Sequence, residues 1–216
     1  MDPARVAVAA IMLLGAAWWD MRERRVPNLY WFPFVAFAAV FLTVDMAQGH
    51  WWDLLGASVV AVLAYLFFRM GLWGGADAKC VMVLAFLVRE NFTAPTTVAA
   101  LDALVAGVTL VLLWPIALTV WNLAHRDTAF PALLIGRVIP IAEAKSRRVW
   151  PLQDSHGWRY RARIGEDLST VYRDLERDGR TEVWVTPQLP LIVFIATGFL
   201  LVTIYGSPLA WLAQLL

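Results

Sequence analysis

Residues 71–80 read GLWGGADAKC, which places an aspartate and a lysine beside glycines in an otherwise apolar part of the chain. The ten residues before this stretch are AVLAYLFFRM, and the eight after it are VMVLAFLV. An ionisable side chain in the middle of a membrane costs about 3 kcal/mol, so such residues usually face the inside of a helix bundle and serve a function. We therefore expect this stretch to mark the functional site.

The composition is that of a membrane protein. Of the 216 residues, 60% are hydrophobic and 16% are charged, and the mean hydropathy is +0.62, which is more apolar than a soluble domain of this length requires. Cys80 is the only cysteine, and the three histidines, His50, His125 and His156, show no paired spacing. We therefore expect no disulfide framework, no metal site and no cofactor, and the sequence predicts no nucleic-acid partner.

Six apolar stretches reach or approach the length of about 20 residues that a membrane-spanning helix needs. Paired tryptophans at Trp18/Trp19 and Trp51/Trp52 stand at the ends of such stretches, where aromatic rings favour the headgroup level. The sequence therefore predicts an all-α polytopic membrane bundle of six transmembrane helices. The predicted spans are residues 4–19, 29–44, 54–68, 72–88, 97–123 and 189–214.

Positive charges are distributed unevenly around these spans. If the N-terminus lies outside, all of the 18 lysine and arginine residues except Arg5 and Arg89 fall on the inner side. Cytoplasmic loops of membrane proteins are enriched in such residues, so this orientation is predicted. The basic cluster at residues 22–25 follows the first apolar run instead of preceding it, which indicates a retained helix and not a cleaved signal peptide.

The chain is expected to divide into three parts. Residues 1–124 hold the first five transmembrane helices, residues 125–187 form a small cytoplasmic α+β insert, and residues 188–216 form the sixth helix. Within the insert, the polar and apolar pattern predicts three short strands and one amphipathic helix that Gly179 stops. The strands are predicted at residues 147–153, 157–164 and 181–187, and the helix at residues 166–179.

The predicted topology brings two acidic residues to the same side of the membrane. The first span runs inward and ends at Asp20, and the fourth runs outward and begins near Asp77. Either acid alone is explained equally well as an interfacial residue, which is also what we expect of Asp102. Two carboxyls within hydrogen-bonding reach share a proton, so that one acts as general base and the other as general acid. The pair therefore predicts the catalytic dyad of an aspartic protease.

The glycines and the lysine around Asp77 allow two interpretations each. Gly74 and Gly75 permit backbone turns that are closed to other residues and let a substrate chain approach closely. Packing of helices through small residues also explains them. Lys79 does not share a helix face with Asp77, and it either anchors the helix at the membrane interface or tunes the electrostatics of the acids.

The segment DMRERRVPN, residues 20–28, resembles the D-x4-R-x-P-N pattern of type IV prepilin peptidases and archaeal preflagellin peptidases. The matching residues are Asp20, Arg25, Pro27 and Asn28. The resemblance implies that Asp20 is catalytic. We expect Pro27 and Asn28 to shape the loop after the first span.

A second segment, GGADAK at residues 74–79, is similar to the G-x-G-D-x-K motif of the same family of membrane aspartyl proteases. Gly74, Asp77 and Lys79 match the motif, and Ala76 stands where the family usually has its second glycine. The resemblance implies that Asp77 is the second catalytic acid. It extends to the last span, so it covers most of the membrane core.

This resemblance implies a membrane aspartyl endopeptidase that removes a short basic leader from preflagellin or prepilin-like proteins at the cytoplasmic face of the cell membrane. Such leaders end just before an apolar helix. The implied partners are preflagellin or prepilin leader peptides and the lipid bilayer. Bacterial bifunctional relatives carry a paired-cysteine domain and methylate the new N-terminus. With one cysteine, this chain is expected to lack methyltransferase activity and to resemble the archaeal enzymes more closely.

Two other functions stay open from the sequence. A presenilin-like intramembrane protease of transmembrane substrates would use the same chemistry, although it is expected to show a Tyr-Asp pair where Trp19 precedes Asp20 here. A proton-coupled transporter would use the two acids as a relay. The hydropathy pattern shows no paired halves of the kind that many transporters have.

Overall fold

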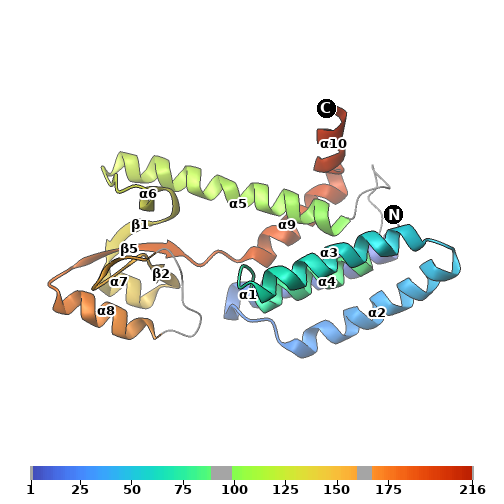
Figure 1. Ribbon diagram of the computed structural model, residues 1–216, viewed down its shortest axis with the longest axis horizontal. Coiled ribbons are helices and arrows are strands. Elements are labelled where there is room, and N and C mark those ends of the chain that lie inside the picture. Colours follow the sequence, from blue (N-terminus) through green and yellow to red (C-terminus); the bar gives the residue numbers. More distant parts are fainter. Residues whose placement is uncertain (1, 89–98, 160–166, 216) are drawn as a thin grey trace. The chain divides into compact units, whose positions relative to one another are not determined.

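The protein is mainly helical and divides into two compact units, residues 1–110 with 190–216 and residues 111–189 (Figure 1). The first unit is built from helices, and the second holds the strands and the short helices. Helix α5, Ala99–Ala124, contributes residues to both units. The computed structural model describes residues 2–88, 99–159 and 167–215.

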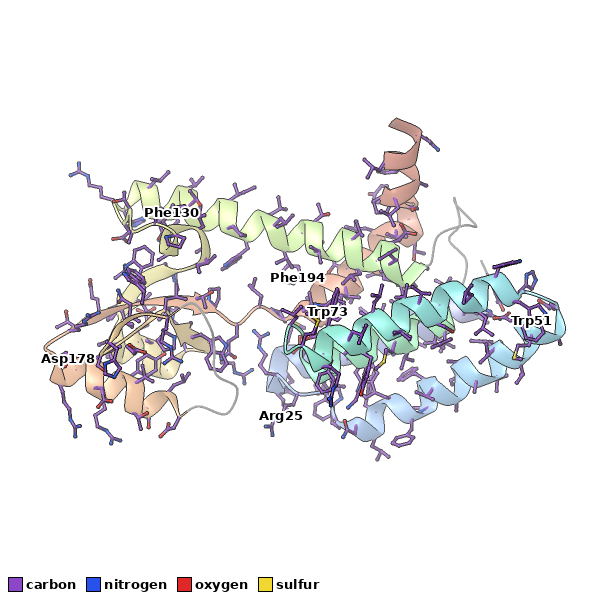
Figure 2. All side chains as sticks on the ribbon, in the orientation of Figure 1. Arg25, Trp51, Trp73, Phe130, Asp178 and Phe194 are labelled. Carbon is purple, nitrogen blue, oxygen red and sulfur yellow. The ribbon has the colours of Figure 1, made fainter. Side chains whose placement is uncertain are left out.

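In the first unit, α4 packs against α1, α2 and α3, and α1 also packs against α9. Side chains fill the space between these helices, with Arg25 and Trp73 at one end of the unit and Trp51 at the other (Figure 2). The helices, besides α5, are α1 (Pro3–Glu23), α2 (Asn28–Ala47), α3 (Trp51–Arg69), α4 (Gly75–Leu87), α9 (Leu191–Tyr205) and α10 (Pro208–Leu215).

Helix α1 begins and ends at well-defined signals. The Asp2 carboxylate accepts a hydrogen bond from the Ala4 amide at 2.9 Å, and Pro3 occupies the first turn, where its missing N–H has no consequence. The helix ends at Arg24, which adopts a left-handed conformation with φ 56° and donates its N–H to the Asp20 carbonyl oxygen. The last turn of α1 therefore holds Asp20.

Tyr30 fixes α2 against α1. Its hydroxyl group donates a hydrogen bond to the Met12 carbonyl oxygen at 2.8 Å. Gly15 leaves room for the ring, since a Cβ atom at this position would clash with the Tyr30 hydroxyl oxygen. A small residue in α1 thus allows the two helices to approach closely, as is common between membrane helices.

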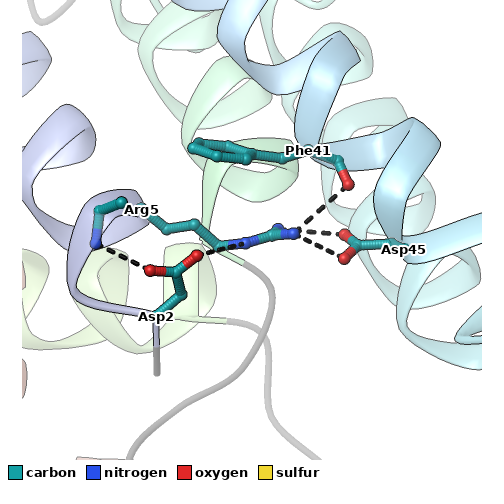
Figure 3. Close-up of polar contacts among 5 residues, drawn as sticks. Asp2, Arg5, Phe41 and Asp45 are labelled. Atoms are coloured by element: carbon teal, nitrogen blue, oxygen red, sulfur yellow. Dashed lines mark hydrogen bonds and ion pairs between the residues drawn. The ribbon is translucent and has the colours of Figure 1, made fainter. Parts of the chain in front are cut away.

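An ion pair joins the other ends of these two helices (Figure 3). The Arg5 Nη1 and Nη2 atoms donate to the Asp45 carboxylate at 3.0 Å and 2.6 Å, and Nη2 also donates to the Phe41 carbonyl oxygen at 3.3 Å. Both charged side chains are buried. A bidentate pair of this kind compensates the charge of an arginine in an apolar setting. Arg5, one of two basic residues outside the predicted inner side, therefore has a local partner.

The end of α9 differs from the prediction. The predicted span over residues 189–214 is wrong in treating this segment as one helix, because α9 ends at Gly206 with φ 92° and α10 begins at Pro208. Ser207 between them is fully buried, and its hydroxyl donates a hydrogen bond to the buried carboxylate of Asp102. Asp102 is thus buried inside the protein, and its expected position at the level of the membrane interface stays a prediction.

Helix lengths support a membrane protein. Among the described residues, α1, α2 and α5 are long and apolar enough to cross a membrane, and two shorter apolar helical stretches cover Leu54–Arg69 and Leu191–Tyr205. Helix α4 has 13 residues, because it starts at Gly75 and not near residue 72. The prediction of six spans with the N-terminus outside stays a prediction.

The second unit contains a three-stranded antiparallel sheet with strand order β1-β5-β2. The sheet side chains Ile139, Val183 and Val185 form a buried cluster with Val171 and Leu175 of α8. The elements of this unit are α6 (Ala132–Ile135), β1 (Arg137–Pro140), α7 (Ile141–Ser146), β2 (Val149–Pro151), β3 (Gln153–Asp154), β4 (Gly157–Trp158), α8 (Leu168–Arg177) and β5 (Glu182–Pro187).

The amphipathic helix of the insert is confirmed. Helix α8 begins after Asp167, whose carboxylate accepts hydrogen bonds from the Ser169 hydroxyl at 2.8 Å and the Ser169 amide at 3.0 Å. These hydrogen bonds hold the pKa of Asp167 below its usual value, as expected for a helix N-cap. Gly179 follows the helix with φ 77° and stops it as predicted.

The strands were predicted less well. The strand at residues 181–187 is confirmed as β5, but the one at 147–153 is wrong as a single strand and divides into β2 and β3. Of residues 157–164, Gly157–Trp158 form β4, and residues 160–164 lie outside the described residues. The elements β1, α6 and α7 were missed, because they are too short to show a hydrophobic period.

Candidate active site

Asp20 is a buried carboxylate in the last turn of α1, with 9% of its surface exposed. Its Oδ2 atom has no hydrogen-bond partner among the described residues. The carboxylate interacts with the backbone N–H of Ile192, the second residue of α9. The first N–H groups of a helix have no partner within the helix and carry a partial positive charge, so this position favours a carboxylate.

Asp77 lies at the start of a different helix. It is the third residue of α4, it is half-buried, and its Oδ2 atom accepts a hydrogen bond from the Gly74 amide at 3.2 Å. This contact closes the first turn of the helix, because an acid at the third position satisfies a free amide before it. The carboxylate that caps α4 is therefore held at one place on the edge of the bundle.

The structure brings the two acids together. Helix α1 packs on α4, and the Asp20 and Asp77 carboxylates lie within reach of each other's charge. In the part of the chain that is described, no hydrogen bond joins them. The Arg24 guanidinium also acts on both acids. The two side chains thus form one electrostatic site, although 57 positions separate them in the sequence.

Arg24 is a site residue that sequence analysis missed. The cluster at residues 22–25 was used to orient the spans, to predict a retained first helix and, through Arg25, to match the first motif, but no role at the acids was predicted for Arg24. A usable signal was present, since Arg24 follows Asp20 by four residues and such pairs lie on one helix face. Its place next to the acids helps to compensate two negative charges at the end of an apolar bundle.

The reason for the glycines before Asp77 differs from the prediction. Gly74 has φ −69° and Gly75 is the first helical residue, so neither needs the conformational freedom of glycine. The interpretation as special backbone turns was wrong for both glycines, and the left-handed residue of this stretch is Gly71, with φ 72°. At Gly74 a Cβ atom would lie 2.8 Å from the Asp77 Oδ2 atom, whereas at Gly75 it would make an ordinary contact with Phe68 at 3.4 Å. Gly74 is therefore needed for space beside the carboxylate.

Lys79 connects the two motifs. Its Nζ atom donates a hydrogen bond to the Asn28 Oδ1 atom at 2.6 Å, which links α4 to the first residue of α2. Pro27 stands just before α2 and sets its start. Arg25 is exposed, and within the described residues no hydrogen bond or ion pair joins it to either acid. The motif residues around the loop therefore position the helices that carry the acids.

An apolar groove begins at the hydrogen bond between Asn28 and Lys79. It has a volume of about 650 Å³ and runs between α2 and α4, with Asn28 and Lys79 at one end. Further along, its walls are almost entirely apolar. Lys79 and Asp77 are both in the first turns of α4 but on different faces of the helix, so the groove starts at the same end of α4 as Asp77, and neither Asp20 nor Asp77 lines it. Its other lining residues are Trp31, Phe32, Val35, Ala38, Ala39, Leu42, Met82, Val83 and Phe86.

The described residues hold no cluster of three or more histidine, cysteine, aspartate or glutamate side chains that could bind a metal ion. The polar groups at the site are thus two carboxylates, a guanidinium, a lysine ammonium and an amide. Two carboxylates at the rim of an apolar bundle can exchange protons with water and with a bound polar group.

Comparisons with known proteins give the chain's similarities. A family model described as the type IV leader peptidase family matches residues 7–121, and one described as archaeal peptidase A24 C-terminus type II matches residues 131–207. The chain is 25% identical to a preflagellin peptidase of Methanococcus voltae, over 93% of this chain and 94% of the relative. It is 24% identical to a preflagellin peptidase of Methanocaldococcus jannaschii, over 93% of each chain. Asp20 and Asp77 both lie in the first matched segment.

The link between Asn28 and Lys79 can be measured by a double-mutant cycle. We expect Asn28→Ala and Lys79→Met to show a coupling free energy of about 1 kcal/mol in detergent unfolding, since a hydrogen bond from a charged donor is lost in either variant and this one is partly exposed. The control combines Lys79→Met with Thr43→Ala, at the far end of α2. The changes in the free energy of unfolding from these two substitutions should add. A coupling below about 0.3 kcal/mol for the first pair would show that the contact does not form.

Proposed function

Because the chain belongs to the type IV leader peptidase family, we propose that it is a membrane aspartyl endopeptidase that removes a short basic leader from preflagellin or prepilin-like proteins. The observation that carries this proposal is the meeting of Asp20 and Asp77 at one end of the helical unit. The similarity to preflagellin peptidases over nearly the whole chain supports the choice of substrate.

The proposed reaction uses both carboxyls and one water molecule. The ionised carboxylate takes a proton from water, and the resulting hydroxide attacks the carbonyl carbon of the peptide bond. The protonated carboxyl donates its proton to the carbonyl oxygen, which gives a tetrahedral diol intermediate. When the C–N bond breaks, the first acid gives its proton to the leaving nitrogen and the second takes a proton back from the diol. The pair then holds one proton again.

The surroundings of the acids suit these two roles. Asp77 keeps one oxygen occupied by the Gly74 amide at 3.2 Å, whereas the buried Oδ2 atom of Asp20 has no hydrogen-bond partner among the described residues. A buried polar atom without a partner is uncommon and often marks a position where a water molecule or a reactant binds. We propose that the attacking water lies between this oxygen and the Asp77 carboxyl.

We further propose that the acids face the cytoplasm. This orientation places the basic residues near the site, among them Arg24 and Lys79, on the inner side together with those of residues 111–189, in agreement with the positive-inside rule. Arg5 falls on the outer side, where the buried Asp45 carboxylate compensates it. The one basic residue of the described chain on the outer side is thus paired.

The groove between α2 and α4 is the proposed site for the apolar segment that follows the cleaved bond. Its polar end at Asn28 and Lys79 lies at the N-terminal ends of α2 and α4, the end of α4 that also carries Asp77, and its apolar walls continue along both helices. A substrate whose apolar segment lies in this groove has its leader outside and its scissile bond at the polar end. The groove would then select substrates by the position of an apolar helix as well as by the leader.

The catalytic pair is tested by Asp20→Asn and Asp77→Asn. Each change removes a group that must accept or donate a proton, so cleavage of a preflagellin-like substrate in detergent should fall by at least about 10³-fold, measured by product mass over time. Glu23→Gln, at the last residue of α1, is the matched control and should keep its activity. Substantial cleavage by either aspartate variant, with the protein still folded, would contradict the proposed dyad.

The two glycines give a finer test of the geometry. Gly74→Ala places a methyl group against the Asp77 carboxylate, and a displaced catalytic group should lower kcat about tenfold to a hundredfold. Gly75→Ala makes an ordinary contact and should stay within about twofold of the wild type. Equal kcat values for the two variants, with unchanged melting temperatures, would show that space at Gly74 is not what holds the acid in place.

The groove is tested by filling it. Ala39→Trp introduces an indole into the groove, so KM should rise at least about fivefold for a full-length substrate, which corresponds to about 1 kcal/mol of lost binding. A short peptide that ends soon after the cleaved bond should be unaffected. Ala36→Trp, on an exposed position of α2 that does not line the groove, is the control. An unchanged KM in Ala39→Trp would place the apolar segment elsewhere.

A further inference from the structure

A second cavity lies in the other unit, at the end of α5. It has a volume of about 630 Å³. One wall is a stripe of α5, in which Trp114, Leu118 and Trp121 follow one another at intervals of four and three residues and so share a helix face. Helix α5 is one of the helices long and apolar enough to cross a membrane. The cavity therefore adjoins the end of a candidate transmembrane helix, where tryptophans are typical.

Basic side chains form another wall of the cavity. Arg137 of β1 and the consecutive residues Arg147 and Arg148 before β2 line the cavity, and no acidic residue of the described chain lines it. Arg147 pairs with Glu143 at 2.8 Å, an ion pair in which both side chains are substantially exposed. Such an exposed pair is weak and exchanges readily with another anion. The wall thus offers three guanidinium groups to one cavity.

The sheet fixes this wall in place. Arg137 pairs with Val185, and Val149 pairs with Pro187. Residues opposite each other in an antiparallel sheet, and residues two apart in a strand, point to the same side. Arg137, Val149, Val185 and Pro187 therefore occupy the same face at one end of the sheet, and Val149, Val185 and Pro187 give the cavity an apolar floor next to the arginines.

The chain that leads into β1 is also tied to α5. The buried side chain of Asn122 donates its Nδ2 hydrogen atoms to the Leu133 carbonyl oxygen at 2.8 Å and the Gly136 carbonyl oxygen at 2.7 Å. Gly136 lies so close to β5 that a Cβ atom there would be 2.6 Å from the Val185 carbonyl oxygen. Arg137 follows directly, so its position relative to the tryptophans of α5 is set by buried contacts.

We propose that this cavity binds the phosphate group of an anionic phospholipid. Arginine binds phosphate through paired hydrogen bonds, and its weak hydration suits a site at the membrane surface. Basic pockets beside transmembrane helices on the cytoplasmic side recognise lipid headgroups in this way. The stripe of Trp114, Leu118 and Trp121 provides an apolar path for the acyl chain, which a free phosphate ion does not need. The bound lipid holds the sheet to the end of α5.

The test compares lipids and variants by binding and not by peptidase activity. The full-length protein, purified and stripped of lipid in a neutral detergent, is titrated with dioleoyl phosphatidylglycerol, dioleoyl phosphatidylcholine or inorganic phosphate, and the melting temperature and retained lipid in native mass spectra are recorded. Phosphatidylglycerol should raise the melting temperature and stay bound, whereas phosphatidylcholine and inorganic phosphate should have little effect at equal concentration.

Substitutions in and away from the cavity test whether the lipid binds there. Arg137→Gln combined with Arg148→Gln should weaken phosphatidylglycerol binding at least about tenfold, since two charged hydrogen-bond donors are lost. Arg177→Gln with Arg180→Gln, on exposed positions at the end of α8, removes the same charge elsewhere and should bind like the wild type. Trp114→Ala, which leaves the arginines intact, should weaken lipid binding and not change the response to inorganic phosphate.

Three results would overturn the proposal. Equal binding of the two lipids would show that charge is not recognised, and an equal effect of inorganic phosphate would identify a free anion as the ligand. Equal loss of binding in both arginine pairs would indicate general electrostatic attraction and no site. Circular dichroism and gel filtration of each variant confirm that it is folded, and single Arg137→Gln and Arg148→Gln variants provide a milder test if the pair does not fold.

Discussion

The structure depends on placing two carboxylates at the edge of an apolar helical unit. Each carboxylate lies at the N-terminus of a helix. Asp77 caps its own helix, α4, and Asp20, at the end of α1, interacts with the second amide of α9. Free amides and the helix dipole stabilise negative charge at these positions, and Arg24 adds a full positive charge beside both acids. The start of α9 therefore contributes to the site although it lies at residue 191, far from both motifs.

The contact that holds the Asp77 carboxylate is also the contact that caps the beginning of α4. The Gly74 amide donates a hydrogen bond to the Asp77 carboxylate. Because Gly74 has no side chain, there is room for this carboxylate next to it. Lys79, two residues after Asp77, connects α4 to the first residue of α2 by a 2.6 Å hydrogen bond. Gly74, Asp77 and Lys79 of the second motif thus act together, because each makes a different contact at the N-terminus of α4.

The apolar stretches were sufficient to predict a helical membrane protein, and two short motifs at residues 20–28 and 74–79 were sufficient to predict the family. The meeting of the two acids was predicted from the order and direction of six spans, a topology that itself stays a prediction. It could not show that Ile192 faces Asp20 or that Lys79 bonds Asn28, since these contacts depend on how helices pack. The role of Gly74 was misread for a related reason. A glycine looks the same in a sequence whether it serves a positive φ angle, as at Gly71, or leaves space for a neighbour. In the second unit, β1, α6 and α7 are held by pairing with β5 and by contacts such as those of Asn122, and short elements of this kind carry little local signal.

The proposed groove has a consequence for how a cleavage site would be chosen. Helices α2 and α4 both begin at the end that holds the acids, so the polar end of the groove between them lies at the same end of the unit as the proposed reaction site. The lining of α2 runs from Asn28 to Leu42, which is 15 residues and about 21 Å of helix. An apolar helix of similar length in the groove would place the bond before it at the end of the unit that carries the carboxylates. The sequence of the leader would then adjust the rate, whereas the start of the apolar segment would decide which bond is cut.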